Sequence, residues 1–344
     1  ITSGGDKNTV VGDEAGTAIT TGDFNTALGF EAGHDITTGS ANTIIGGLAG
    51  DKLIDASYNV AIGSGAIGAD TKGSKSIAIG YNSLVTQNFT SATDTFNVAI
   101  GFEAGKAVTT AVQNTLIGGL AGDAITTGGY NTAVGYLSGS AITTGSGNAF
   151  FGLRAGAGTT TGTANTFVGG SSNSYAGYAN TTGANNTAVG TDALAANTTA
   201  SNNTAVGMDA LTANTTGTNL TVVGKDAAKA STTANNGVAV GTQAMNTATT
   251  ASSTTAVGAT ALYSLTTVDN NTAVGFASAY STTTGGNNTG LGAYTLYDNT
   301  TGASNTAVGT SALANNTTAN NNTAVGFQSL TVNSTGASNT GIGY

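Results

Sequence analysis

A repeat of 17 residues runs along the chain and limits what it can fold into. The pentapeptide N-T-A-V-G and its variants occur 20 times, and their closing glycines run from Gly12 to Gly343. Each interval is 17 residues long, except for Gly80 to Gly101 and Gly169 to Gly190, which are 21 residues long. A fixed period of this kind is typical of repeat architectures, in which each unit packs mainly on its two neighbours.

We number the repeat from its Asn, so that N-T-A-V-G occupies positions 1 to 5. Position 1 is Asn in 16 of the 20 copies, position 4 is apolar in all of them, and position 8 is nearly always Ala or Ser. Positions 13 to 15 often read T-T-G, as in Thr20–Gly22. The unit is too short for a pair of helices, which takes about 34 residues.

Two short runs of residues, positions 2–4 and 12–14, have the composition of strands, and each is followed by Gly. Thr and the other β-branched residues favour strands, whereas Gly supplies turn conformations. The sequence therefore predicts an all-β fold: a parallel β-solenoid (β-roll) of about 20 coils, in which each strand pairs with its copy 17 residues later. Residues 1–344 are expected to form one repeat region. Four-residue insertions near 81–96 and 170–179 would form surface loops or contact points.

The absence of proline supports stacked coils and the overall composition excludes several classes of function. The chain has no Pro, Cys or Trp, and a proline has no N–H to give to the next coil. Without Cys there is neither a disulfide nor a thiolate metal site. A net charge of -9 with 7% charged residues argues against a basic surface for nucleic acid. No apolar run has the ~18 residues of a membrane span, and we expect no cofactor.

Asn at position 1 predicts a ladder of side-chain amides. Identical Asn side chains stacked along a repeat can hydrogen-bond to one another. The predicted ladder at the turn is represented by Asn25, Asn42, Asn131, Asn271 and Asn305.

Alternation along the strand separates the inward from the outward side chains. Positions 2 and 4 share one face and position 3 lies on the other. Because position 4 is apolar in every copy, we expect it to fill the interior of the coil. The predicted core comprises Val11, Leu28, Ile45, Ile62, Ile117, Val134, Val206 and Val274.

Position 3 should then point outward, although no copy of it is polar. Its bulkiest members are Ile44, Leu116, Phe150, Phe167 and Val222. An apolar stripe of this length would be a large exposed patch on a monomer, so it is predicted to be a subunit interface. A parallel homotrimer or a laterally associated fibre fits best, and a dimer or a sheet-like bundle stays open. The repeats approach both ends, so we expect an excerpt of a longer shaft or end-to-end stacking into a filament.

The sequence offers no recognisable catalytic arrangement. The only histidine, His34, occupies a variable coil position, and the neighbours Asp13 and Glu14 would point to opposite faces of an extended segment. Such a pair is a poor general acid and base. There is also no phosphate-binding G-x-x-x-x-G-K-[ST] loop. We therefore predict neither an enzyme nor a metal site.

Several copies of the repeat resemble known families. N-V-A-I-G at Asn59–Gly63 and Asn97–Gly101 resembles the head repeats of YadA-type trimeric autotransporter adhesins, although those heads use shorter units. The unit at Asn305–Ala319 is similar to the N-T-A-V-G repeats of phage tail-fibre and bacterial surface proteins. The resemblance implies a trimeric β-roll or β-solenoid that is extracellular and attached to a surface. It also implies a glycan or protein receptor.

Two functional hypotheses follow. The first is a structural and adhesive fibre shaft, from a phage tail fibre or a bacterial surface filament, with no catalytic activity. The second is an ice-binding β-solenoid, since stacked Thr columns on a flat surface can order water. Replacement of Thr at position 2 by Val60 and Ile77 suggests that this column is buried, which counts against the second hypothesis.

Overall fold

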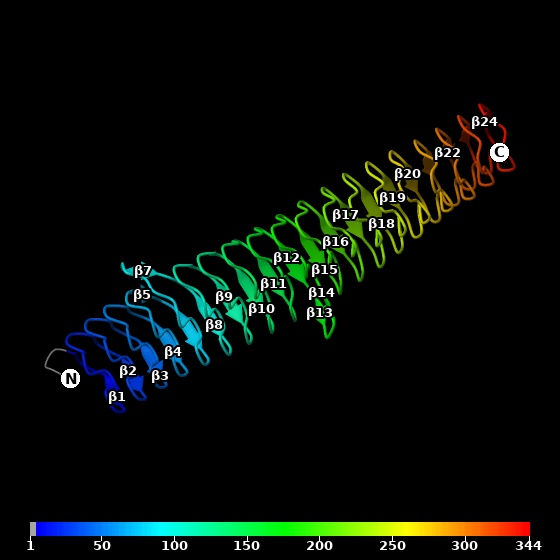
Figure 1. The fold of residues 1–344 in the computed structure, drawn as a ribbon. Coiled ribbons are helices and arrows are strands. Elements are labelled where there is room, and N and C mark those ends of the chain that lie inside the picture. The colour runs from blue at the N-terminus through cyan, green and yellow to red at the C-terminus, as the bar shows by residue number, and fades with distance from the viewer. Residues whose placement is uncertain (1–4) are drawn as a thin grey trace. The chain divides into compact units, whose positions relative to one another are not determined.

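The chain is an all-β parallel β-solenoid of about 20 turns with a repeat of 17 residues. The computed structural model describes residues 5–344. The chain forms two compact units, residues 1–167 and residues 168–344. Within each unit, successive turns stack on one another with their strands side by side (Figure 1).

Each turn contributes one three-residue strand at positions 2–4. The strands of the first unit are β1 (Thr9–Val11), β2 (Thr26–Leu28), β3 (Thr43–Ile45), β4 (Val60–Ile62), β6 (Ile77–Ile79), β8 (Val98–Ile100), β9 (Thr115–Ile117), β10 (Thr132–Val134) and β11 (Ala149–Phe151). Those of the second are β15 (Thr187–Val189), β16 (Thr204–Val206), β17 (Thr221–Val223), β18 (Val238–Val240), β19 (Thr255–Val257), β20 (Thr272–Val274), β21 (Thr289–Leu291), β22 (Thr306–Val308), β23 (Thr323–Val325) and β24 (Thr340–Ile342). Strand β12 (Thr166–Val168) crosses the boundary. Pairing is parallel and in register with the repeat, as in Thr26 opposite Thr43.

Small elements outside the main ladder accompany the two longer intervals. In the first unit, β5 (Gly73–Ser74) pairs in parallel with β7 (Thr93–Asp94). In the second unit, β13 (Gly170–Ser171) and β14 (Ser174–Tyr175) form an antiparallel hairpin.

The first longer interval is anchored by a buried carboxylate. Asp70 is completely buried at position 12. Its oxygens accept hydrogen bonds from the backbone N–H of Phe89 at 3.0 Å and from the side-chain amide of Gln87 at 2.6 Å. The fold thus holds the longer interval with a polar network in place of the apolar side chain, Leu53, found at position 12 of the preceding turn.

The predicted second strand at positions 12–14 does not form, and this part of the prediction is wrong. These residues bend, and one carbonyl of the next turn serves several donors. The Thr37 carbonyl oxygen accepts the backbone N–H groups of Thr20 and Thr21 at 3.0 and 3.2 Å, and the Thr20 hydroxyl at 3.0 Å. The T-T-G segment therefore closes a corner, because its donors converge on one acceptor instead of alternating as a strand requires.

The closing glycine of each strand is required by a close approach between turns. Gly207 has a φ of 132°, a conformation that residues with a side chain rarely adopt and that glycine tolerates. A Cβ there would lie 2.6 Å from the carbonyl oxygen of Gly224 in the next turn. Position 5 is Gly in all 20 copies because both the backbone conformation and the spacing exclude a side chain.

The predicted core at position 4 is wrong, since position 4 faces outward. Val11 is 57% exposed and Val274 is 38% exposed. The other residues of that prediction are exposed or half-buried as well: Leu28, Ile45, Ile62, Ile117, Val134 and Val206. The narrow coil takes the small residues of position 3 inside, and strict alternation then places positions 2 and 4 on the outer face.

The predicted subunit interface at position 3 is wrong for the same reason. Its members are buried within their own units, at 0% exposure for four of them and 1% for the last: Ile44, Leu116, Phe150, Phe167 and Val222. The rings of Phe150 and Phe167 stack at 5.0 Å in the interior of the first unit. These side chains are core and cannot contact another subunit.

Core volume is balanced among positions 3, 9 and 12 of the turn. In the first unit, Gly156 faces the Phe150 ring, and a Cβ there would lie 2.6 Å from Cε2 of that ring. In the second unit, Leu211 fills position 9, and position 12 is the buried Asn214. In each of these turns at least one of the three positions carries a small or polar residue, which leaves room for the larger side chains.

Candidate functional surface

The outward face of the strands, which we call the strand face, consists of positions 2 and 4. It is apolar or Thr-bearing, and none of the 20 copies places a charged residue there. Position 2 is exposed or half-buried along both units, so the Thr column that was expected to be buried faces solvent. A continuous uncharged surface of this kind is unusual on a free protein.

Exposed aromatic side chains follow the strand face at position 6, directly after the closing glycine. In the first unit Phe30 is 50% exposed and Phe102 is 55% exposed, and the Phe102 ring stacks on that of Tyr81 at 5.5 Å. In the second unit Phe276 is 51% exposed. Large apolar groups therefore remain in solvent beside a surface that already lacks charge.

Successive strands are held in register by a buried amide ladder at position 1. The side-chain amide of Asn42 donates to the Asn25 oxygen at 3.0 Å, and the same Asn25 oxygen accepts the Asn42 backbone N–H at 3.0 Å. Ser76 interrupts this ladder, which starts again at Asn97 and runs to Asn131, and Asn305 joins the stretch that starts at Asn271. These hydrogen bonds hold each turn in register with the turn before it, which aligns the columns of outward side chains.

A second amide ladder occupies position 12 in the second unit. The side chain of Asn197 donates to the Asn180 oxygen at 2.7 Å, and that of Asn214 donates to the Asn197 oxygen at 3.2 Å. These residues replace the apolar core residues found at this position in the first unit, such as Ile19 and Ile36. The same backbone accepts either kind of column.

Charged side chains form small surface pairs away from the strand face. His34 Nδ1 lies 2.6 Å from the Asp35 carboxylate, and Lys52 bridges Asp35 and Asp51 at 3.5 and 3.3 Å. Partial burial tends to raise the pKa of Asp35, but the His34 hydrogen bond and the Lys52 charge outweigh it and lower that pKa. Asp51 is itself buried, whereas His34, Asp35 and Lys52 reach the surface, where ion pairs contribute little to stability.

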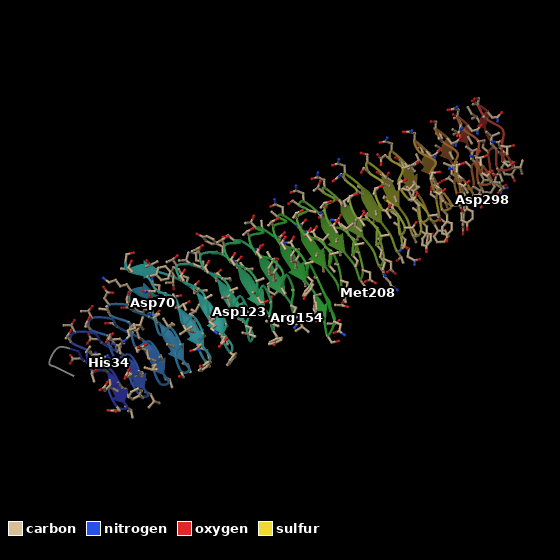
Figure 2. The ribbon with its side chains drawn as sticks, viewed as in Figure 1. His34, Asp70, Asp123, Arg154, Met208 and Asp298 are labelled. Carbon is tan, nitrogen blue, oxygen red and sulfur yellow. The ribbon has the colours of Figure 1, made fainter. Side chains whose placement is uncertain are left out.

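Asp123 differs from these paired acids because one of its carboxylate oxygens is buried. It is half-buried, and its Oδ1 atom is buried without a hydrogen-bond partner. Burial, with a smaller contribution from the Glu103 charge, raises the pKa of this carboxyl. Figure 2 places Asp123 well apart from His34 on the first unit, so the two do not form an acid–base pair.

Among the described residues there is neither a metal cluster nor a membrane-spanning helix. Residues 5–344 contain no cluster of three or more His, Asp or Glu side chains placed to hold a metal ion. Over the same residues, no helix has the length and apolar character needed to cross a bilayer.

Known protein families do not identify the chain. No protein-family model matches it, and no curated protein is significantly similar to it.

The sequence interpretation missed an aromatic row at position 17. In the first unit Phe24, Tyr58, Phe96 and Tyr130 occupy this position in every second turn, with side chains 48% to 63% exposed. The aromatic residues recur in every second copy of the repeat, so a comparison of single copies shows no preferred residue type at this position. We call these four residues the aromatic edge.

Proposed function

We propose that the chain is a structural and adhesive segment of an extracellular fibre, from a phage tail-fibre shaft or a bacterial surface filament, and that it has no catalytic activity. The observation that carries this proposal is the uncharged strand face, which recurs in every turn. At about 4.8 Å per turn, it extends over roughly 45 Å in each unit. A three-residue strand is about 10 Å long, so the face covers roughly 450 Å² in each unit, about half of the ~800 Å² that each partner contributes to a standard interface.

Further copies of the chain are the proposed occupants of the strand face. Every copy carries the same columns at the same spacing, so two strand faces match along their length. A parallel homotrimer closes the arrangement and hides the face from solvent, and a laterally associated fibre does the same in an open form. The strand face, at positions 2 and 4, is therefore the proposed subunit interface in place of position 3.

Sedimentation of the intact chain tests the association. We expect an oligomer at micromolar concentration, and a shift toward monomer when Val206→Lys and Val274→Lys place charges on the strand face. Thr216→Lys, at the exposed position 14, is the matched control and should leave the mass unchanged. A wild-type monomer, or a double variant with unchanged mass, contradicts the proposal.

Ice binding is the second candidate, favoured by the outward Thr column. Thr204, Thr272 and their equivalents at position 2 lie in register on the strand face and are partly exposed. Such a column can order water, provided that the face is free. Thermal hysteresis measured on the wild type and on Thr272→Lys decides this. Activity that is lost in the variant supports ice binding, and an inactive wild type excludes it.

A further inference from the structure

Two features of the aromatic edge in the first unit are unfavourable for stability: the rings are exposed, and their backbone is left-handed. Phe24, Tyr58 and Tyr130 are 58%, 63% and 63% exposed, so they contribute little to the core. Their φ angles are 59°, 63° and 63°, in the left-handed region that bulky residues disfavour and Asn tolerates. An unfavourable conformation retained at an exposed residue points to a function for that residue.

The second unit shows that the fold does not require aromatic residues at this position. The equivalent turns there carry small polar residues with the same backbone conformation, mostly Asn: Asn185, Asn202, Asn219, Asn236, Asn270, Asn287 and Asn321. Within one chain, the same corner is therefore built with rings in one unit and with amides in the other. The rings must serve something other than the corner.

The spacing of the aromatic edge is fixed by the backbone. The N–H of Tyr58 donates to the Ser40 carbonyl at 3.0 Å, and that of Tyr130 donates to the Val112 carbonyl at 3.1 Å. Rings recur every second turn, which is a separation of about 9.6 Å at 4.8 Å per turn. This is close to the length of one disaccharide in an extended sugar chain.

We propose that the aromatic edge binds an extended, neutral polysaccharide, with one disaccharide unit for each interval between rings. Aromatic rings offer apolar surface to the C–H faces of sugars, and the Tyr hydroxyls can hydrogen-bond to sugar hydroxyls. This proposal rests on the adhesive role proposed above and gives that role a ligand class.

The residues between the rings favour a glycan over a second copy of the chain. Ala41, Lys75, Gln113 and Gly147 occupy the intervening turns. The long polar side chains of Lys75 and Gln113 would obstruct interdigitation of rings from another copy. Both can donate hydrogen bonds to sugar hydroxyls.

Apart from Lys7, whose ammonium lies 4.7 Å from the centre of the Phe24 ring, the local charge fits a neutral ligand. The Lys75 ammonium lies 2.6 Å from the Asp94 carboxylate and 5.2 Å from the centre of the Phe96 ring, so its charge is already balanced. An acidic polysaccharide would find no unpaired cation at Lys75.

Binding of soluble hexasaccharides to the full chain tests the proposal. Cellohexaose is an extended β-1,4-linked chain and maltohexaose is a coiled α-1,4-linked one, and calorimetry measures both. We expect cellohexaose to bind at least tenfold more tightly than maltohexaose, and cellotriose, which is too short to span successive intervals, to bind more weakly. The variant Phe24→Asn, Tyr58→Asn, Phe96→Asn, Tyr130→Asn should lose at least tenfold in affinity for cellohexaose.

The variant copies the residue that the second unit uses at the same position, so folding should be retained, and circular dichroism checks this. Phe276→Thr removes an equally exposed ring at position 6 of the second unit and should leave binding unchanged. Absence of wild-type binding to cellohexaose, equal binding of the two hexasaccharides, or unchanged binding by the fourfold variant overturns the proposal. The proposal is also overturned if the fourfold variant binds glycan as before but sediments with a lower oligomeric mass. That result would show that the aromatic edge contacts a second copy of the chain.

The failure of this proposal is distinguishable from failure of the fibre proposal. Sedimentation of the strand-face variants reports association through positions 2 and 4, and the fourfold variant leaves those positions intact. Loss of glycan binding with unchanged oligomeric mass supports the assignment of the two surfaces to two roles.

Discussion

The side-chain amide of Asn42 donates a hydrogen bond to the side-chain oxygen of Asn25, 17 residues earlier, at 3.0 Å, and both residues are buried. This contact fixes the distance between turns and also the orientation of the strand that follows. Because Asn42 at position 1 points inward, alternation places Thr43 outward, Ile44 inward and Ile45 outward. An inward Asn at position 1 thus goes with an outward position 4.

Neighbouring substitutions test that assignment directly. Ile44→Asp places a carboxylate in a fully buried site and should destabilise the first unit by about 3 kcal/mol or more. Ile45→Asp changes a half-buried outward residue and should cost less than about 1 kcal/mol. Chemical denaturation of the two variants measures the difference. Equal losses of stability, or a greater loss for Ile45→Asp, would return position 4 to the core.

The close approach at the closing glycine predicts severe destabilisation by a single methyl group. In Gly207→Ala the alanine must adopt a φ of 132°, and its Cβ would lie 2.6 Å from the Gly224 carbonyl oxygen. We therefore expect the free energy of unfolding to fall by about 3 kcal/mol. Gly286→Ala is the matched control, because its Cβ would lie 3.5 Å from the Asp269 oxygen and Ala303 occupies the same position one turn later. Thermal unfolding should separate the two variants clearly. A Gly207→Ala protein as stable as the control refutes the steric account.

Substitution of two adjacent asparagines, one buried and one exposed, should change stability to very different extents. Asn203 is buried, donates to the Gly217 carbonyl at 2.8 Å and accepts the Leu220 N–H at 3.0 Å. Asn203→Ala leaves both partners unsatisfied and should cost about 2–4 kcal/mol. Asn202→Ser changes an exposed residue to one that Ser253 already provides at this position, and should be nearly neutral. Hydrogen exchange at the neighbouring turns reports the loss where it occurs, since repeat proteins are stabilised locally.

Asp123 predicts a pH-dependent difference in stability. Burial raises the pKa of its carboxyl above the ordinary value of 3.8, so the folded protein binds this proton more tightly than the unfolded chain does. The stabilisation that this provides is complete below about pH 3.8 and is lost as pH rises through the raised pKa of the folded state. Asp123→Asn should therefore be more stable than the wild type at pH 7, by at most about 1 kcal/mol because the group is half-exposed. Melting temperatures at pH 7 and pH 3 test this, and an equal gain at both values rules it out.

Much of the fold can be predicted from the sequence because it repeats. The 17-residue period predicts the parallel pairing of Thr26 with Thr43 and the positions of both longer intervals. The corner at positions 12–14 could not be predicted, since Thr20 and Thr21 have the composition of a strand and bend only because their donors meet the Thr37 carbonyl. The aromatic edge escaped notice because it repeats every two turns.

The sequence by itself determined the period, the register, the parallel stacking and the need for glycine at the end of each strand. It did not determine which face is inside, because alternation has a period of two and an interpretation displaced by one residue exchanges every inward and outward side chain. Apolar character pointed to position 4, whereas the narrow interior accepts the mostly small side chains of position 3, with occasional rings such as Phe150 opposite Gly156. Only the packed turn could decide this, because the volume available inside depends on positions 3, 9 and 12 together.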